Sequence, residues 1–258
     1  MRCCSVVFMK LVKLAIRIQL DNSTIAKLIP FITTVVLYFS LIQHTDRGST
    51  PSTVLKCMPI FSLLFFVMLT TAKNAKTIQY QKRILYGLLF SSLGDFLLNY
   101  DLFEAGMGAF GIAQVFYISA FGMKPLKPLI GLILYLLGFL ATAVFFGNLK
   151  PLIKVCLPFY ATLLLTMCWR SLARIEGSQN YSRLACGIAS ILFVISDGII
   201  AFDKFFTPIQ AAQTYIMVTY YLAQVGITLS VNDVQLNEPK SFKKLPERPN
   251  KSTGTKSY

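Results

Sequence analysis

Two aspartates, Asp95 and Asp197, lie inside long apolar segments of this 258-residue chain. A carboxyl group is costly to bury in a helix that spans lipid, so by default such a residue marks a functional site. Two acids in different surroundings can also divide the work of proton donor and base. The structural alternative is that both groups only hold helices together through interhelical hydrogen bonds. We take Asp95 and Asp197 as the candidate catalytic residues.

Further polar side chains recur at helical spacing within neighbouring apolar segments. Such stripes are expected to face the interior of a helix bundle, because lipid offers them no hydrogen-bond partner. A basic residue at the start of the second segment is placed to reach an acid or an anionic headgroup. The candidate substrate-binding residues are Lys56, Gln114, Tyr117, Tyr220 and Gln224.

The two aspartates belong to an internal repeat. Residues 94–103 (GDFLLNYDLF) and 196–205 (SDGIIAFDKF) share the pattern small-Asp-x-aliphatic-aliphatic-x-x-Asp-x-Phe. Downstream, the Ala-Gln-Val of 113–115 returns at 223–225, and upstream Lys56 and Pro59 resemble Lys154 and Pro158. All three matches lie four apolar segments apart and in the same order. The pattern predicts two parallel four-helix halves. The alternative is a coincidence, because apolar segments often match by chance.

The composition predicts the element that carries these groups. The chain is 55% hydrophobic with a mean hydropathy of +0.60, which is typical of a polytopic membrane protein. We predict an all-α fold, a bundle of eight transmembrane helices each close to the roughly 20 residues that cross a bilayer. The apolar segments cover residues 25–43, 54–72, 83–100, 104–122, 129–147, 151–169, 183–203 and 209–231.

The charge distribution predicts the orientation. The net charge is +14, and 20 of the 25 Lys and Arg residues lie at the two ends and in every second loop. Short basic loops of this kind are cytoplasmic in membrane proteins, so both termini are predicted to be cytoplasmic. The same clustering argues against nucleic-acid binding. We expect residues 1–24 to form a basic amphipathic segment, residues 25–231 the transmembrane domain and residues 232–258 a disordered basic tail.

The sequence contains few residues that could bind a metal ion or form a catalytic triad. Its one histidine, His44, lies in a polar turn, and its six cysteines include no CxxC pair. This argues against a histidine-cysteine zinc site and against a Ser-His-Asp triad. We expect no metal or organic cofactor. Trp169 and Arg170 end the sixth segment, where they are predicted to act as an interfacial anchor.

Several short stretches give the chain a family resemblance. They are residues 55–61 (LKCMPIF), Gly94-Asp95, residues 116–125 (FYISAFGMKP), residues 195–197 (ISD) and residues 219–224 (TYYLAQ). In this order and spacing, the chain resembles the lysoplasmalogenase-like (YhhN) family of integral membrane proteins, animal type. The resemblance implies an eight-helix protein, in animals often of the endoplasmic reticulum. It also implies hydrolysis of the vinyl ether bond of lysoplasmenylethanolamine or lysoplasmenylcholine to a fatty aldehyde and a glycerophosphoethanolamine or glycerophosphocholine.

The resemblance suggests roles for the candidate residues. Vinyl ether hydrolysis needs a proton donor and a negative group near the developing cation, which Asp95 and Asp197 could supply in either order. The polar residues on the neighbouring helices would orient water or the glycerol hydroxyl, and Lys56 would bind phosphate. Gln114 departs from the family, because relatives often carry histidine there. The partners expected are a lysophospholipid and membrane lipids, with a homo-oligomer open; the alternative function is a transporter or scramblase of lipids or small amphiphiles.

Overall fold

The computed structural model describes residues 22–72, 74–175 and 181–236, and this part of the chain is helical without any strand. The all-α fold class is therefore confirmed. The α-helices are α2 (Asn22–Leu41), α3 (Thr50–Met68), α4 (Ala75–Asn99), α5 (Phe103–Phe121), α6 (Pro128–Phe145), α7 (Pro151–Ala173), α8 (Tyr181–Phe205) and α9 (Ala212–Leu236). Two short 3-10 turns, Ile42–His44 and Phe146–Asn148, follow α2 and α6.

The helix starts follow local sequence signals. Proline occupies the first turn of α3, α6 and α7, where its missing N–H would have no partner in any case. Ser49 caps α3 by accepting from the N–H of Ser52, and Asn74 caps α4 by accepting from the N–H of Thr77 at 2.9 Å. Such caps satisfy backbone donors that the first turn leaves unpaired.

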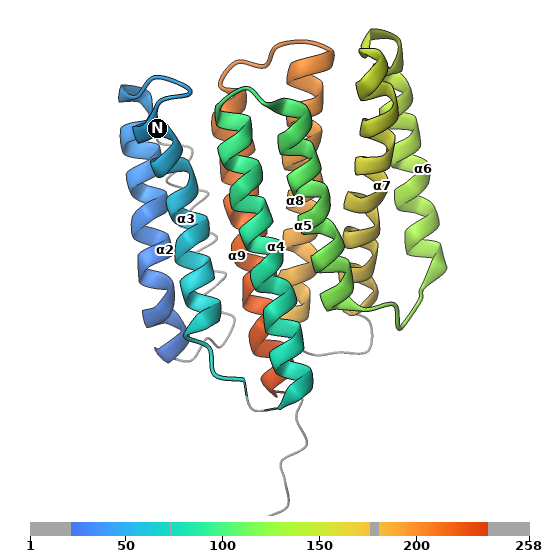
Figure 1. The fold of residues 1–258 in the computed structure, drawn as a ribbon. Coiled ribbons are helices and arrows are strands. Elements are labelled where there is room, and N and C mark those ends of the chain that lie inside the picture. Colours follow the sequence, from blue (N-terminus) through green and yellow to red (C-terminus); the bar gives the residue numbers. More distant parts are fainter. Residues whose placement is uncertain (1–21, 73, 176–180, 237–258) are drawn as a thin grey trace, which may run out of the picture.

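The helices run alternately up and down the bundle (Figure 1). In that view α2 and α3 lie at one side, α6 and α7 lie at the other, and α4, α5, α8 and α9 fill the middle. Across the halves, α3 packs on α9 and α5 packs on α7. A twofold axis along the bundle would relate these two contacts to each other, but the packing of α4 on α9 has no counterpart of similar extent between α8 and α5. The repeat itself stays a prediction.

Several helices suit a membrane. Five of them, α2, α3, α7, α8 and α9, are long and apolar enough to cross a bilayer by length and composition, and α6 is apolar but shorter. The chain is accordingly an integral membrane protein. Helix α4 carries basic residues in its first turns and Asp95 near its end, and α5 carries Gln114 at its centre, so polar groups lower the hydropathy of both. Eight crossings remain a prediction.

Some boundaries differ from those expected. Helix α4 begins at Ala75 instead of residue 83, because the polar turns before the apolar run continue the helix from the Asn74 cap. Helix α9 continues to Leu236, so the boundary at 231 falls inside a helix. The amphipathic segment predicted over 1–24 lies outside the described residues except for its last three, which belong to α2. Residues 237–258 of the predicted tail also lie outside them.

Glycines let α4 and α5 approach closely. A Cβ on Gly87 would lie 2.2 Å from the ring of Tyr117, and one on Gly94 would lie 2.6 Å from the ring of Phe110. Small residues at such contacts allow backbones to pack tightly in lipid, where association relies on van der Waals contact. Gly94 thereby seats Phe110 beside Asp95.

Arg170 fastens a loop instead of anchoring the chain at the membrane interface. Its side chain is fully buried and donates to three backbone carbonyls of the α5–α6 connection, those of Gly122 (2.7 Å), Pro125 (2.7 Å) and Leu126 (3.1 Å). The indole of Trp169 donates to the carbonyl of Lys127 at 2.9 Å. The planar guanidinium presents several donors in fixed directions, which suits it to this role.

The Arg170 contacts predict a stability effect. The Arg170→Ala substitution removes three charge-assisted hydrogen bonds and should lower the free energy of unfolding by about 3 kcal/mol. Thermal unfolding of the purified protein in detergent measures the change, with the exposed Lys124→Ala as the matched control. An Arg170→Ala protein that melts with the wild type would show that the loop is held by other contacts.

Candidate functional site

Asp95 is buried at the end of α4 nearest the α4–α5 turn, and groups from two other helices hold it. Its side chain is 2% exposed. The Tyr220 hydroxyl of α9 donates to Oδ2 at 2.6 Å, and the ammonium of Lys56 on α3 lies 3.7 Å from Oδ1. The same ammonium lies 3.4 Å from the backbone oxygen of Asp95. The three side chains form a buried, charge-compensated cluster.

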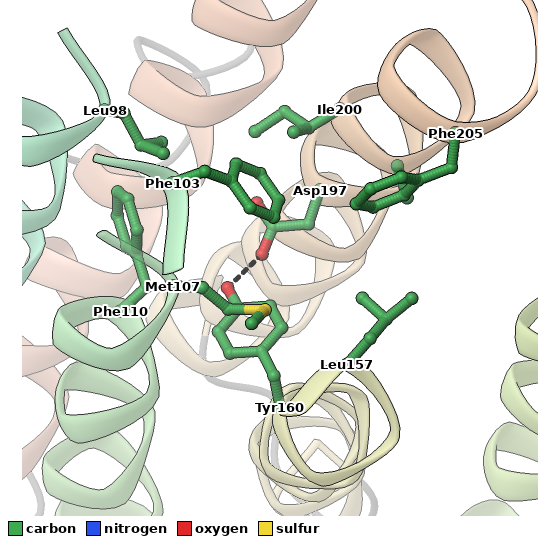
Figure 2. Close-up of a pocket in the computed structure, with 10 residues that line it drawn as sticks. Leu98, Phe103, Met107, Phe110, Leu157, Tyr160, Asp197, Ile200 and Phe205 are labelled. Carbon is green, nitrogen blue, oxygen red and sulfur yellow. Dashed lines mark hydrogen bonds between the residues drawn. The ribbon is translucent and has the colours of Figure 1, made fainter. Parts of the chain in front are cut away.

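Asp197 of α8 is half-buried and differs in its partners. The Tyr160 hydroxyl of α7 donates a hydrogen bond to its carboxylate Oδ2 (Figure 2). Among the described residues, no Lys or Arg forms an ion pair with this carboxylate, in contrast to Asp95. Asp197 is therefore held by a neutral donor in a largely apolar setting.

Both carboxylates line one cavity. It has a volume of about 250 Å³, which exceeds by many times the roughly 10–15 Å³ that one water needs on the same measure. Lys56 and Tyr220 also line it, and its outer lining includes charged residues near the α4–α5 and α8–α9 turns: Arg47, Asp101, Asp203 and Lys204. Arg47 and Asp101 form an exposed ion pair at 3.4 Å. The two aspartates of the predicted repeat thus line the same cavity.

A narrow apolar pocket of about 40 Å³ adjoins this cavity (Figure 2). Five residues line both spaces: Leu98, Phe103, Phe110, Asp197 and Ile200. Met107, Leu157 and Phe205 complete much of the apolar wall. The carboxyl group of Asp197 therefore lies at the junction of a polar and an apolar space.

The remaining predicted residues lie behind the cavity wall. Tyr117 and Gln224 are fully buried, and the Tyr117 hydroxyl donates to Oε1 of Gln224 at 2.8 Å, which joins α5 to α9. Gln114 is also fully buried, and neither atom of its amide makes a hydrogen bond of normal geometry within the described residues. None of these three is among the residues that line the cavity.

The structure brings together four of the seven predicted site residues, Asp95, Asp197, Lys56 and Tyr220, around one space. It adds Tyr160, which the sequence analysis missed. Tyr160 is the single tyrosine of its apolar segment, and a hydroxyl in such a run is a signal that could have found it. In the described part of the chain, no group of three His, Cys, Asp or Glu side chains could hold a metal ion.

The family profile that matches this chain is that of the YhhN family, and it covers residues 52–231. The chain belongs to the YhhN family. The matched range contains both aspartates, Lys56, Tyr160 and Tyr220.

Curated relatives cover most of the chain. Lysoplasmalogenase TMEM86A of Bos taurus is 36% identical over 219 residues, which are 83% of this chain and 90% of the relative. The Homo sapiens lysoplasmalogenase TMEM86A is 35% identical over 85% of this chain and 93% of its own length. Lysoplasmalogenase TMEM86B of Sus scrofa is 36% identical over 79% and 85%. No solved structure matches.

The buried pair of Lys56 and Asp95 predicts a thermodynamic coupling. Removal of one partner leaves an uncompensated buried charge, so Lys56→Met should lower the free energy of unfolding by about 3 kcal/mol. The double substitution Lys56→Met with Asp95→Leu should recover most of that loss, because it removes both charges. Thermal unfolding of the two variants in detergent provides the comparison. Equal loss in the single and the double variant would show that the pair is not charge-coupled.

Proposed function

We propose that this protein is a lysoplasmalogenase, which hydrolyses the vinyl ether bond of a lysoplasmalogen to a fatty aldehyde and a glycerophospho-ethanolamine or -choline. The observation that carries the proposal is the convergence of Asp95 and Asp197 on one cavity that adjoins an apolar pocket. The relatives named lysoplasmalogenase, similar over about four fifths or more of the chain, support the same reaction. No observation favours transport.

Asp197 is proposed as the proton donor. A vinyl ether is protonated at the alkene carbon on the side of the aliphatic chain, and Asp197 lies where the apolar pocket meets the polar cavity. It forms no ion pair within the described residues, so no neighbouring cation holds it in the charged form. Once it has lost its proton, the hydrogen bond from Tyr160 stabilises the carboxylate.

Asp95 is proposed as the anionic partner. Lys56 and Tyr220 compensate its charge, and together they keep a carboxylate facing the cavity. A fixed negative charge stabilises the oxocarbenium ion that protonation creates. The same carboxylate is placed to accept a proton from the water that attacks this ion. The two acids thereby take different roles because their neighbours differ.

The steps balance as follows. The alkene π electrons take the proton of Asp197, which forms a C–H bond and leaves positive charge shared between the adjacent carbon and the ether oxygen. Water adds to that carbon and gives one proton to Asp95, which yields a hemiacetal. The hemiacetal loses its C–O bond to glycerol, the hydroxyl proton passes to the leaving oxygen, and the aldehyde is released. Return of the proton from Asp95 to Asp197, through water in the cavity, restores the resting state.

Two roles suggested by the sequence change with this geometry. Lys56 is buried against Asp95, whereas the ion pair of Arg47 with Asp101 is exposed. We therefore assign phosphate binding to Arg47 and Lys204, cations of the outer lining. Tyr117 and Gln224 join α5 to α9. Neither these two residues nor Gln114 lines the cavity, so we assign them no contact with substrate. Under this proposal, glutamine in place of histidine at Gln114 is compatible with activity.

We further propose an endoplasmic reticulum membrane location with both termini in the cytoplasm. The α3–α4 and α5–α6 connections lie at one end of the bundle, and the α4–α5 and α8–α9 turns lie at the other (Figure 1). Basic residues concentrate at the first end, which the positive-inside rule places in the cytoplasm. The cavity then lies in the half of the bundle nearer the lumen.

Aldehyde release tests the catalytic assignment. Purified Asp197→Asn should lose activity on lysoplasmenylethanolamine by about 100- to 10,000-fold, the usual contribution of a positioned proton donor. Asp95→Asn should fall by a similar factor, and Tyr160→Phe by about tenfold because only a stabilising hydrogen bond is lost. The aldehyde is measured by coupled reduction. Wild-type activity in both asparagine variants would refute the mechanism.

The control for that test is the isotopic composition of the product. In D₂O, the proposed protonation places one deuterium on the carbon next to the aldehyde carbonyl, which immediate reduction to the alcohol preserves for mass spectrometry. A diacyl phospholipid, which has no vinyl ether, should release no aldehyde. An aldehyde without deuterium would exclude proton transfer to the alkene carbon.

Cysteine labelling tests the orientation. Asp46 and Lys124 are exposed at opposite ends of the bundle. In a background with Cys3→Ser and Cys4→Ser, Lys124→Cys should react with an impermeant maleimide in intact microsomes, whereas Asp46→Cys should react only after the membrane is permeabilised. The opposite pattern would reverse the proposed topology.

A further inference from the structure

The apolar pocket beside Asp197 is a lipid-binding feature in its own right. We propose that it is the binding site for the aliphatic chain of a single-chain lipid, and that it fixes the position of the first chain carbons against Asp197. The inference deepens the proposed function, on which the identity of the lipid rests. It assigns chain recognition to a pocket lined by side chains of α4, α5, α7 and α8.

The lining has the chemistry of a chain site. Apart from the Asp197 carboxyl group and the Tyr160 hydroxyl, every side chain that lines the pocket is aliphatic, aromatic or a thioether. These two polar groups are hydrogen-bonded to each other (Figure 2). Phe103 and Phe205 meet edge to face with centroids 5.7 Å apart and close part of the wall. A hydrocarbon chain would contact apolar side chains along the pocket. A polar group would find no hydrogen-bond partner there except the Asp197 carboxyl group and the Tyr160 hydroxyl, which already bind each other.

The wall shared by the pocket and the cavity sets the position of the lipid's aliphatic chain relative to Asp197. Leu98, Phe110 and Ile200 line both the pocket and the polar cavity, so the two spaces meet beside Asp197. A lipid whose glycerol occupies the cavity must pass its chain across this junction. The first carbons of the chain are then adjacent to the carboxyl group, where a proton is delivered.

The small volume of the pocket limits how many aliphatic chains it can hold. A space of about 40 Å³ admits a short run of one extended chain and excludes a second. Bilayer tails are as apolar as the pocket, so a chain that enters from lipid gains little hydrophobic free energy. Close van der Waals contact then decides which chain fits. The pocket positions and selects the chain, while the outer charges provide binding for the headgroup.

Beyond the pocket, the rest of the aliphatic chain can lie along an apolar surface of the protein. Leu102, Phe202 and Phe206 are exposed and are sequence neighbours of lining residues in α5 and α8. Phe202 and Phe206 pack with ring centroids 4.9 Å apart. In a membrane these side chains face acyl tails, so the distal part of a long chain stays in the bilayer. The pocket therefore contacts only the chain carbons near the headgroup and tolerates aliphatic chains of different length.

Photo-crosslinking to the full-length protein in nanodiscs tests the proposal. The probe is a saturated 1-O-alkyl lysophosphoethanolamine with a diazirine on the third or fourth chain carbon; it has no vinyl ether and is not cleaved. We expect labelling within residues 98–110, 157–160 and 197–205, mapped by mass spectrometry. Labelling confined to other helices would overturn the assignment.

Two variants and a control make the test specific. Ala201→Phe fills the pocket and should reduce labelling about tenfold, since misfit by even one methylene in an apolar pocket changes discrimination by about tenfold or more. Ala141→Phe adds the same bulk on an exposed position of α6 and should label as the wild type. Leu157→Ala widens the pocket. It should increase the competition of a chain methyl-branched near the headgroup relative to a straight chain by about tenfold, a gain that misfolding cannot produce.

The outcomes separate this inference from the proposed function. Pocket labelling that responds to Ala201→Phe in a protein that releases no aldehyde would support the chain site and contradict the lysoplasmalogenase assignment. Aldehyde release together with unchanged labelling in Ala201→Phe and unchanged chain preference in Leu157→Ala would support the enzyme and overturn the chain site.

Discussion

The structure depends on the compensation of one buried carboxylate. Lipid offers a charged group no hydrogen-bond partner, so the protein must supply groups that compensate the charge. Asp95 on α4 obtains them from α3 through Lys56 and from α9 through Tyr220. The requirement binds three helices at one point, and it places a polar chamber at the end of α4.

The two halves of the predicted repeat differ in the groups that contact their aspartates. In the first half, Lys56 of α3 pairs with Asp95. Its counterpart in the second half, Lys154 of α7, lies over the ring of Phe146 at 5.4 Å, and α7 instead offers Tyr160 to Asp197. One aspartate thus has a cation beside it, and the other has a neutral hydroxyl. Under the proposed mechanism, this difference suits one acid to donate a proton and the other to remain charged.

Most of the fold could be predicted from the sequence, because the length and apolar character of each helix are visible in the order of its residues. The polar stripes that include Asp95 on α4 and Tyr220 on α9 were also predictable, since lipid penalises polar groups that face outward. The partner of Lys56 was not, because a lysine can reach an acid or a headgroup with equal ease and the choice depends on helix packing. Tyr160 was missed since tyrosine is common in membrane helices. Arg170 was misread as an anchor because its three acceptors are backbone carbonyls, which leave no trace in residue types.

The junction at Asp197 has a consequence for what leaves the protein. The cavity has charged residues at its outer lining near the helix turns, whereas the apolar pocket is flanked by side chains that face lipid. Cleavage beside Asp197 under the proposed reaction creates one fragment that is soluble in water and one that is soluble in hydrocarbon. Each fragment is generated on the side that suits its solubility, so the two can depart by separate routes, and the reactive aldehyde enters the membrane without crossing an aqueous phase.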